Sequence, residues 1–282
     1  MSPSCALCGG EVSQHLFTKG GRAFLRCVAC RLVRVDPLPE PEQIAPHYDA
    51  SYREGTYAAF AEAGGTRGGI ASYRLEIVRE LSPSGLWLDI GCSSGDFLEA
   101  ASRVGVEVEG IDVSEEAVRR ARARGLRARC IPVEGFEPEA PYDLVTAFDV
   151  IEHVRDPRGF VRRLRDWLAP RGHLVLTLPN VSSVYPRLLM RRHWFYYLPH
   201  EHLFYFEPRT ITRLLREEGF GVQRVSRAYK PMSLAYASRN LRLFNPTLGG
   251  IASAAVSLLP RRLAERDWKL YVGEMLVLAL RD

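Results

Sequence analysis

The sequence predicts an α/β protein with a mainly parallel sheet and a small cysteine-rich module in front of it. Short apolar runs alternate with segments of helical periodicity from Leu86 onward, which is the pattern of βαβ units. A turn of small residues, 91–95, joins the first of these runs to the first helical segment. Two Cys-x-x-Cys pairs near the start of the chain predict a zinc-stabilised unit.

Seven apolar runs are predicted as strands, and helical spacing between them predicts the connecting helices. The expected strands are residues 86–90, 106–111, 128–131, 142–148, 173–178, 220–226 and 274–280. The expected helices are residues 97–104, 115–124, 157–168 and 208–218. The spacing of Ile70, Tyr73, Ile77 and Leu81 predicts one further helix before the first strand.

Proline and glycine positions divide the chain into three parts. A zinc ribbon is expected at residues 1–35, followed at 36–85 by a stiff proline-rich linker and an N-terminal helical cap. Within this cap the glycine-rich residues 64–69 are expected to be flexible. The α/β domain would occupy residues 86–282. Its segments 179–207 and 230–273 fall outside the repeat and are expected to build a substrate site or an interface.

The composition argues for a globular protein, with 46% hydrophobic and 25% charged residues over 282 positions. The net charge of +5 is modest, and the basic side chains are nearly all arginines, which suit phosphate or carboxylate groups. We do not infer nucleic-acid binding from this balance. No apolar run approaches the ~20 residues that cross a bilayer, and the first residues lack the pattern of a signal sequence. We therefore expect a soluble, cytoplasmic protein.

Four of the six cysteines form the pairs Cys5-x-x-Cys8 and Cys27-x-x-Cys30. Their spacing is typical of a zinc ribbon, in which two knuckles bring four thiolates onto one tetrahedral ion. All four ligands would be protein sulfurs, so the Zn²⁺ would be structural rather than catalytic. Two disulfides, disfavoured by a reducing compartment, and a redox pair are the alternatives. The remaining cysteines, Cys92 and Cys130, are expected to be small core residues.

A polar turn with an acid downstream predicts a ligand site at the end of the first strand. Parallel sheets bind ligands beyond the carboxyl ends of their strands, where glycine lets backbone amides approach a ligand. The spacing Gly91-x-Ser93-x-Gly95 differs from the Gly-x-Gly-x-x-Gly of dinucleotide sites, and acids flank it, Asp89 among them. Such acids disfavour a pyrophosphate and suit a cationic ligand. Asp112, at the end of the next strand, is placed to accept hydrogen bonds from ribose hydroxyls.

This stretch, from Leu86 to Phe220, resembles the class I S-adenosylmethionine-dependent methyltransferases, whose first motif is Asp/Glu-x-Gly-x-Gly/Ser-x-Gly. The resemblance implies a Rossmann-like, seven-stranded, mostly parallel sheet, closed by an antiparallel strand at 274–280. It also implies S-adenosylmethionine as methyl donor and S-adenosylhomocysteine as product. The residues that it places around the donor are Asp89, Gly91, Ser93, Gly95, Phe97, Asp112, Val113, Val133, Phe148 and Asp149. An unrelated nucleotide-binding fold is the alternative.

Two histidine-containing segments follow the strands that would flank the transferred methyl group. Residues 149–154 end the fourth strand, and residues 199–206 lie beyond the fifth. Methyl transfer needs a positioned nucleophile, which His, Glu or Asp often deprotonates. We interpret His202 as the first candidate for this base, with Glu201 orienting a ring or a substrate hydroxyl, and His153 as the second. The alternatives are that His153 caps packing under the sheet and that His-Glu-His binds a metal.

The string His-Glu-His-Leu-x-Tyr-Phe at 200–206, together with a four-cysteine zinc domain, resembles sugar C-methyltransferases. In that family the Glu-His pair, here Glu201 and His202, belongs to the catalytic centre, with the histidine as proposed base. That family has Tyr where this chain has Pro199, and a long C-terminal domain that would follow Asp282. A shorter group resembles this chain more closely: the zinc-ribbon methyltransferases of polysaccharide and natural-product pathways.

The leading hypothesis is therefore O- or C-methylation of a small-molecule acceptor, a sugar or a secondary metabolite. The aromatic, arginine-rich segment 185–197 is expected to cover this acceptor, with its arginines holding a phosphate or carboxylate. A contact with an anionic membrane surface and simple helix packing are the alternatives for this segment.

Three other functional classes stay open. The Asp-Val-Ile-Glu-His string at 149–153 also resembles ubiquinone-pathway O-methyltransferases. A zinc ribbon with a methyltransferase occurs in ribosomal RNA methylation, but the Asn/Asp-Pro-Pro-aromatic motif of base N-methylation does not occur at 148–151. A domain that binds the donor only to regulate a partner is the third class. The oligomeric state is left open.

Overall fold

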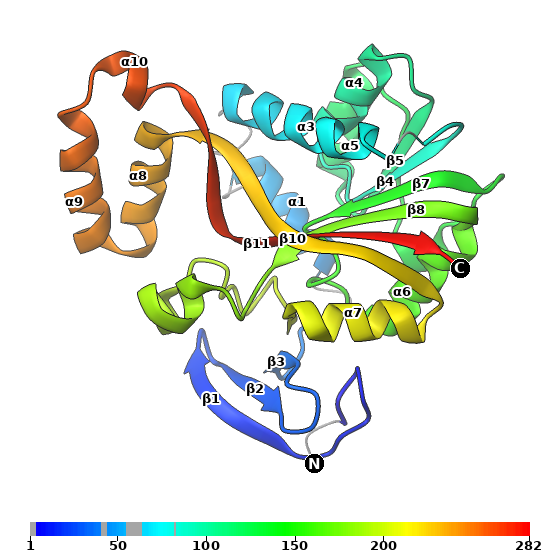
Figure 1. Ribbon diagram of the computed structural model, residues 1–282, viewed down its shortest axis with the longest axis horizontal. Helices are drawn as coiled ribbons and strands as arrows, with labels where there is room; N and C mark the ends of the chain where they lie inside the picture. Colours follow the sequence, from blue (N-terminus) through cyan, green and yellow to red (C-terminus); the bar gives the residue numbers. More distant parts are fainter. Residues whose placement is uncertain (1–3, 41–43, 55–63, 82) are drawn as a thin grey trace.

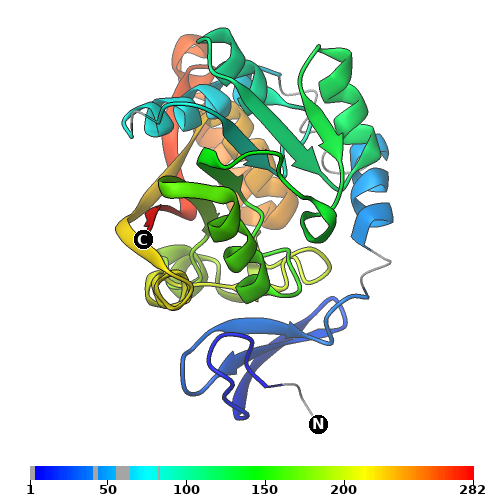
Figure 2. The same ribbon diagram turned by 90° about the vertical axis from the view of Figure 1, so that its right-hand side faces the viewer.

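We describe the chain from a computed structural model, which describes residues 4–40, 44–54, 64–81 and 83–282. Two β-sheets organise it: a seven-stranded central sheet and a four-stranded N-terminal sheet. Figures 1 and 2 show the N-terminal sheet as a separate layer beside the central domain. Within the described residues, no helix is both long and apolar enough to cross a membrane.

The central sheet has the strand order β10-β11-β8-β7-β4-β5-β6, as the α/β prediction requires. Neighbouring strands are parallel, except that β11 runs antiparallel to both β10 and β8. The predicted Rossmann-like, seven-stranded, mostly parallel sheet is therefore confirmed, including its antiparallel closing strand. The strands are β4 (Trp87–Ile90), β5 (Val108–Asp112), β6 (Ala128–Cys130), β7 (Tyr142–Phe148), β8 (Leu168–Pro179), β10 (Phe220–Ser233) and β11 (Asp267–Arg281).

Helices cover both faces of this sheet, because the central strands are apolar on both sides. Alternate residues of a strand point to opposite faces, so Trp87 packs with one layer of helices and Leu88 with the other. Figure 1 shows α3, α4 and α5 on one face and α6 and α7 on the other. These helices are α3 (Gly64–Arg79), α4 (Asp96–Arg103), α5 (Glu115–Ala123), α6 (Pro157–Trp167) and α7 (Pro208–Glu217).

The N-terminal sheet joins the cysteine-rich segment to a distant part of the chain. Its order is β1-β2-β3-β9, and β9 (Phe204–Tyr205) belongs to the segment 179–207 that was predicted as an insertion. Val33 pairs with Tyr205, and Arg34 pairs with Phe204. The other strands are β1 (Ser13–Lys19), β2 (Arg22–Cys27) and β3 (Val33–Asp36). This module therefore supports the chain directly after His202.

The segment 230–273 forms a helical lobe on two long strands. Strands β10 and β11 continue past the sheet as a ribbon that ends in α8 (Leu234–Phe244), α9 (Pro246–Ser257) and α10 (Arg261–Ala264). Figure 1 shows this lobe standing away from the sheet. The remaining elements are α1 (Ile44–Glu54), η2 (Val133–Gly135), η3 (Tyr185–Leu189) and η4 (Arg191–His193).

The structure corrects three expectations. The glycine-rich residues 64–69 are the first turns of α3 rather than a flexible loop. Tertiary packing overrides their low helix propensity, since Leu75 and Val78 of the same helix are buried in the core on this face of the sheet. Strands β8, β10 and β11 are longer than predicted. The prediction missed their ends because the residues there are partly exposed and lack an apolar pattern. Cys130 is exposed at the edge strand β6 and is not a core residue.

Candidate functional site

A cavity of about 1580 Å³ opens beyond the carboxyl ends of β4, β5 and β7. Parallel sheets place ligand sites at this edge. The cavity exceeds the 300–1,000 Å³ of a typical small-molecule pocket, so it has room for two ligands side by side. Nine of the ten predicted donor-site residues line it: Asp89, Gly91, Ser93, Phe97, Asp112, Val113, Val133, Phe148 and Asp149.

The turn after β4 adopts a backbone that the small residues permit. Gly91 has a φ of 69°, and a Cβ there would lie 2.7 Å from Val150 Cγ2, so glycine is required for both reasons. Ser93 also has a positive φ, 53°, which is uncommon outside glycine and occurs often at functional sites. The backbone N–H of Ser93 donates to Asp112 Oδ2 at 2.8 Å. The turn and Asp112, the residue predicted to bind the ribose, therefore form one unit.

Asp112 is held with its carboxylate at the cavity wall. Its Oδ1 accepts a second backbone hydrogen bond, from Ser114 N at 2.9 Å. Burial raises the pKa of Asp112, and the hydrogen bonds from Ser114 and Ser93 oppose this effect. A carboxylate has about four acceptor positions, so it can still accept from a ligand hydroxyl.

Gly95 is the predicted site residue that does not line the cavity. It has a φ of 84° at the start of α4, and a Cβ there would lie 2.4 Å from Leu126 Cδ1. Its lack of a side chain lets the start of α4 approach α5 and Leu126, rather than letting an amide approach a ligand. Asp89, by contrast, is fully buried at the cavity floor, accepts a hydrogen bond from Thr146, and has a pKa that burial raises to about 7.

The other end of the cavity carries a charge network that sequence reasoning did not predict. Asp149, with a φ of 60°, accepts from Arg74 Nη2 at 2.8 Å and lies 3.7 Å from Lys230 Nζ. Lys230 is 2.5 Å from Glu274 Oε1 and donates to Tyr196 Oη at 3.0 Å. Burial alone would raise the pKa of Asp149, but Lys230 and Arg74 hold it below its usual value. These groups lie at least 34 residues apart in sequence, so only the fold brings them together.

Replacing Lys230 by methionine should lower the free energy of unfolding by about 3 kcal/mol, because Glu274 and Asp149 would lose a buried cation. Thermal unfolding would measure this change. The matched control is Lys269→Met, which removes an exposed ion pair with Glu76 and should have little effect. Equal effects of the two variants would contradict the inferred role of Lys230.

Helix α1 covers the donor side of the cavity with two tyrosines. Tyr52 donates to Ser93 Oγ at 2.6 Å, and Tyr48 Oη lies 2.5 Å from His153 Nδ1. Asp49 of the same helix accepts a hydrogen bond from Ser114 Oγ at 2.6 Å. Burial raises the pKa of both tyrosines above their usual value, so both keep their protons at neutral pH. Sequence reasoning did not predict these contacts.

The two predicted histidines meet at the acceptor side. The backbone amides of Leu203 and Phe204 both donate to Glu152 O, which joins the two histidine-containing segments. The ring centroids of His153 and His202 are 4.5 Å apart, and the rings are nearly perpendicular. Burial lowers the pKa of His202 well below its usual value, and that of His153 is lowered by the same cause. Both imidazoles are therefore neutral at pH 7 and can accept a proton.

Glu201 contacts the rings of two histidines, His47 and His153. Its carboxylate lies 3.3 Å from His47 Nε2, and its backbone oxygen lies 3.0 Å from His153 Nδ1. The His-Glu-His metal alternative is not supported, because His200 is exposed while His202 is buried. The ligand atoms that do come within 4.8 Å of one another belong to Glu152, His153 and His202.

The segment 185–197 supplies aromatic side chains to the cavity, as predicted. Tyr185, Phe195 and Tyr196 line it, and the Tyr196 ring stacks on that of His202 with centroids 5.9 Å apart. Its arginines do not line it: Arg187, Arg191 and Arg192 are exposed. Four arginines from other elements reach the cavity instead: Arg67, Arg74, Arg155 and Arg239.

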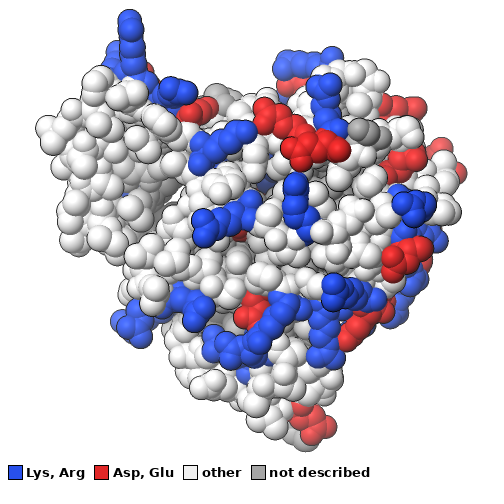
Figure 3. Space-filling model, in the orientation of Figure 1, with Lys and Arg blue, Asp and Glu red and all other residues white. Residues whose placement is uncertain are grey.

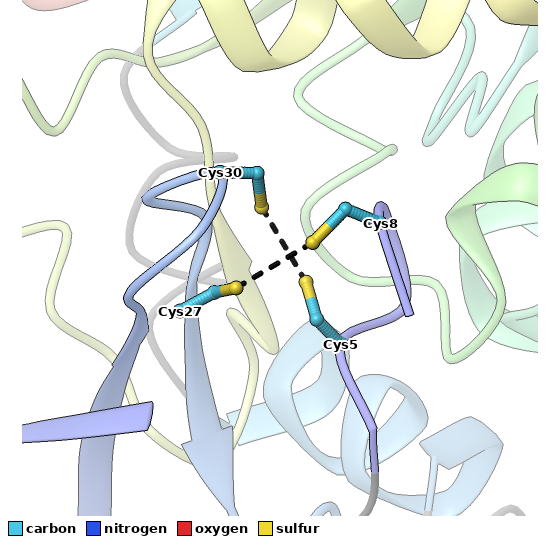
Figure 4. Close-up of side chains that lie close together, drawn as sticks. All are labelled: Cys5, Cys8, Cys27 and Cys30. Carbon is cyan, nitrogen blue, oxygen red and sulfur yellow. Dashed lines mark hydrogen bonds between the residues drawn. The ribbon is translucent and has the colours of Figure 1, made fainter. Parts of the chain in front are cut away.

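The four N-terminal cysteines converge as predicted (Figure 4). Cys5 Sγ lies 3.5 Å from Cys30 Sγ, Cys8 Sγ lies 3.6 Å from Cys27 Sγ, and all four are free thiols. All four sulfurs lie within 4.8 Å of one another. A tetrahedral Zn²⁺ with Zn–S bonds of about 2.3 Å needs sulfurs about 3.8 Å apart, so the four thiols fit such an ion.

Comparison with known proteins agrees with this geometry. A family model described as a methyltransferase domain matches residues 57–225. Ubiquinone biosynthesis O-methyltransferase of Chromobacterium violaceum is 29% identical over 164 residues, covering 53% of this chain and 71% of the relative. The enzyme of the same name from Bordetella avium is 36% identical over 118 residues, covering 38% of this chain and 49% of the relative.

Solved structures show the same fold. A SAM-dependent methyltransferase of Thermotoga maritima, described as a possible histamine N-methyltransferase, has a TM-score of 0.55 at 16% identity and covers 84% of this chain and 99% of its own. Magnesium protoporphyrin IX methyltransferase of Synechocystis, solved with S-adenosylhomocysteine, has a TM-score of 0.54 at 13% identity with the same coverage.

The fold, the turn after β4 and the family match together define the class. The chain belongs to the methyltransferase-domain family. It is an S-adenosylmethionine-dependent methyltransferase with the class I, Rossmann-like fold.

Proposed function

We propose that the cavity binds S-adenosylmethionine at its β4–β5 side and a small-molecule acceptor at its other side. The observation that carries this is the unit formed by the Ser93 amide and the Asp112 carboxylate at the cavity wall. Asp112 would hold the ribose hydroxyls, and Val133 would border the adenine. Phe148 and Asp149 would lie beside the methionine moiety. There the Arg74 guanidinium, 4.4 Å above the Phe148 ring, can pair with the carboxylate of that methionine moiety.

The acceptor side suits a molecule with an apolar part. Met190, Phe195, Met232, Leu241 and Leu270 line it, beside polar groups that include Tyr196, His202 and Lys230. We propose O- or C-methylation of a sugar or a secondary metabolite, with His202 as the base that removes the acceptor proton. Glu201 would assist through the side chains that it orients, and His153 is the second candidate for the base.

Replacing Asp112 by alanine should weaken S-adenosylmethionine binding by ten- to a hundredfold, because charge-assisted hydrogen bonds to the ribose would be lost (about 1.5–3 kcal/mol). Titration calorimetry would measure this, with NAD as the ligand that should not bind. Glu107→Ala removes an exposed carboxylate directly before β5 and is the control. Unchanged affinity in Asp112→Ala would overturn the assigned donor site.

A second candidate is O-methylation of a quinone-type ring. The relatives named ubiquinone biosynthesis O-methyltransferases and the apolar lining of the acceptor side favour it. Turnover assays with a catechol-bearing quinone precursor against a deoxysugar nucleotide would separate the two candidates.

An RNA acceptor receives less support. Two basic residues of the N-terminal module are used within the protein: Arg34 pairs with Asp36 at 2.8 Å, and Arg31 lies 3.8 Å from Glu207. RNA binding by this module would need free cations on one face.

We propose that Cys5, Cys8, Cys27 and Cys30 hold a structural Zn²⁺. The converging free thiols support this proposal, since a disulfide framework would pair them and a catalytic site would leave one position open. The ion would fix the two knuckles from which β1, β2 and β3 extend.

A further inference from the structure

The helical lobe formed by α8, α9 and α10 has an unusual outer surface. Leu248, Ile251, Ala255 and Leu258 are all exposed and follow the i, i+3, i+7, i+10 spacing of one helix face. The exposed fractions are 65% for Ile251 and 86% for Leu258. Leu259 and Leu263 extend this face toward α10. We call these five large side chains, Leu248, Ile251, Leu258, Leu259 and Leu263, the apolar face of the lobe.

This clustering distinguishes the lobe from the rest of the described surface. Scattered single apolar residues are normal on soluble proteins, but a contiguous apolar patch marks an interaction site. The apolar face brings together five of the large exposed hydrophobic side chains within 16 residues, 248–263. Figure 3 shows the lobe as an almost uncharged projection, with basic side chains at its edge.

The charge around the apolar face is mostly positive. Residues 234–266 contain one acid, Glu265, and five arginines, of which Arg239 lines the cavity and the other four stand at positions 242, 261, 262 and 266. Glu265 is paired with Arg261 at 2.8 Å. An apolar helix face bordered by cations is the pattern of a surface that lies in the interface of an anionic bilayer. A second copy of this chain is a poorer partner, because it would bring arginines against arginines.

The lobe is also continuous with the acceptor side of the cavity. Tyr236, Ala237 and Leu241 of α8 line the cavity, while α8 packs against α9, which carries Leu248 and Ile251 of the apolar face. The exposed Leu188 and Leu189 lie next to Met190, which lines the same side. The lobe therefore connects the apolar face to the acceptor side of the cavity.

We propose that the apolar face of the lobe docks this protein onto an anionic lipid bilayer. In this arrangement Leu248, Ile251 and Leu258 enter the acyl boundary, while the arginines contact the headgroups. The proposal goes beyond methyl transfer and does not depend on it, since bilayer binding is measured without donor or acceptor.

Flotation of the full chain with vesicles tests the proposal. We expect it to float with phosphatidylcholine vesicles that contain phosphatidylglycerol, and less with phosphatidylcholine alone. The variant Ile251→Asp/Leu258→Asp should bind at least about tenfold more weakly, because it places two charges in the apolar boundary. The matched control, Val12→Asp/Val104→Asp, changes two exposed apolar residues outside the lobe and should bind like the unchanged protein.

Each alternative gives a distinct result. Absence of flotation, or equal loss in the control variant, would overturn the proposal. A dimer in light scattering that Ile251→Asp/Leu258→Asp dissociates, without vesicle binding, would assign the face to a second copy instead. Because both residues are exposed, near-ultraviolet circular dichroism and S-adenosylmethionine affinity should stay unchanged in the variants, which separates this test from a failure of the donor site.

Discussion

Replacing Cys27 by serine should lower the free energy of unfolding by more than about 3 kcal/mol, because a closed four-sulfur zinc site would lose one ligand. The same variant should also reduce turnover by ten- to a hundredfold. This second effect follows from the position of β9, whose residues come directly after His202 and pair with β3. A misplacement of about 1 Å at a catalytic group costs about a hundredfold in rate.

Packing connects the module to the acceptor side as well. The ring of Tyr197 contacts those of Phe17 and Phe24, with centroids 5.0 and 5.1 Å apart. Val35 N donates to Leu203 O at 3.0 Å, next to His202. Loss of order in β1 to β3 would therefore loosen both the aromatic segment and His202.

Thermal unfolding, zinc content and turnover measure these effects together. Cys130→Ser is the matched control, because it removes an exposed thiol far from the four-cysteine cluster and should change none of the three. A Cys27→Ser protein that unfolds at the original temperature would contradict the zinc assignment. A destabilised protein with full turnover would instead contradict the link to His202.

The parts of the site that the sequence predicts are those that depend on local pattern. The turn after β4 was predictable because Gly91 and Ser93 must adopt positive φ there, and small residues do so at least cost. The two cysteine pairs were predictable because four thiols at ribbon spacing have few other uses. The order of strands and helices followed from hydrophobic period, so the sheet was predicted while the ends of β8, β10 and β11 were not.

The parts that the sequence did not predict depend on contacts between distant segments. Lys230 and Glu274 are unremarkable in sequence, and only the pairing of β10 with β11 brings them beside Asp149. Tyr48 and Tyr52 reach the cavity because α1 packs across its donor side. The arginines of 185–197 were predicted to hold the acceptor. In the fold, aromatic side chains of this segment face the cavity, and its guanidinium groups stay in water.

Replacing His202 by glutamine should lower kcat by about 10²–10⁴-fold, the usual contribution of a positioned general base. Glutamine keeps a polar side chain of similar length, so the KM for S-adenosylmethionine should change little. His200→Gln is the matched control, because His200 is exposed two residues away in the same segment. A larger loss in His153→Gln than in His202→Gln would reverse the assignment of the base.

The pH dependence gives a further check on this base. Burial lowers the pKa of both His202 and His153 below the usual value of 6.5, so the folded protein holds them neutral where free histidine begins to take up protons. The rate should therefore stay level above pH 6.5 and fall only as the pH drops through the lowered pKa. Because the two rings are in contact, the profile reports on the pair. Stability should begin to fall at a higher pH, between 6.5 and the lowered pKa, since the unfolded chain binds these protons first. An acid limb centred above pH 6.5 would exclude both buried histidines as the base.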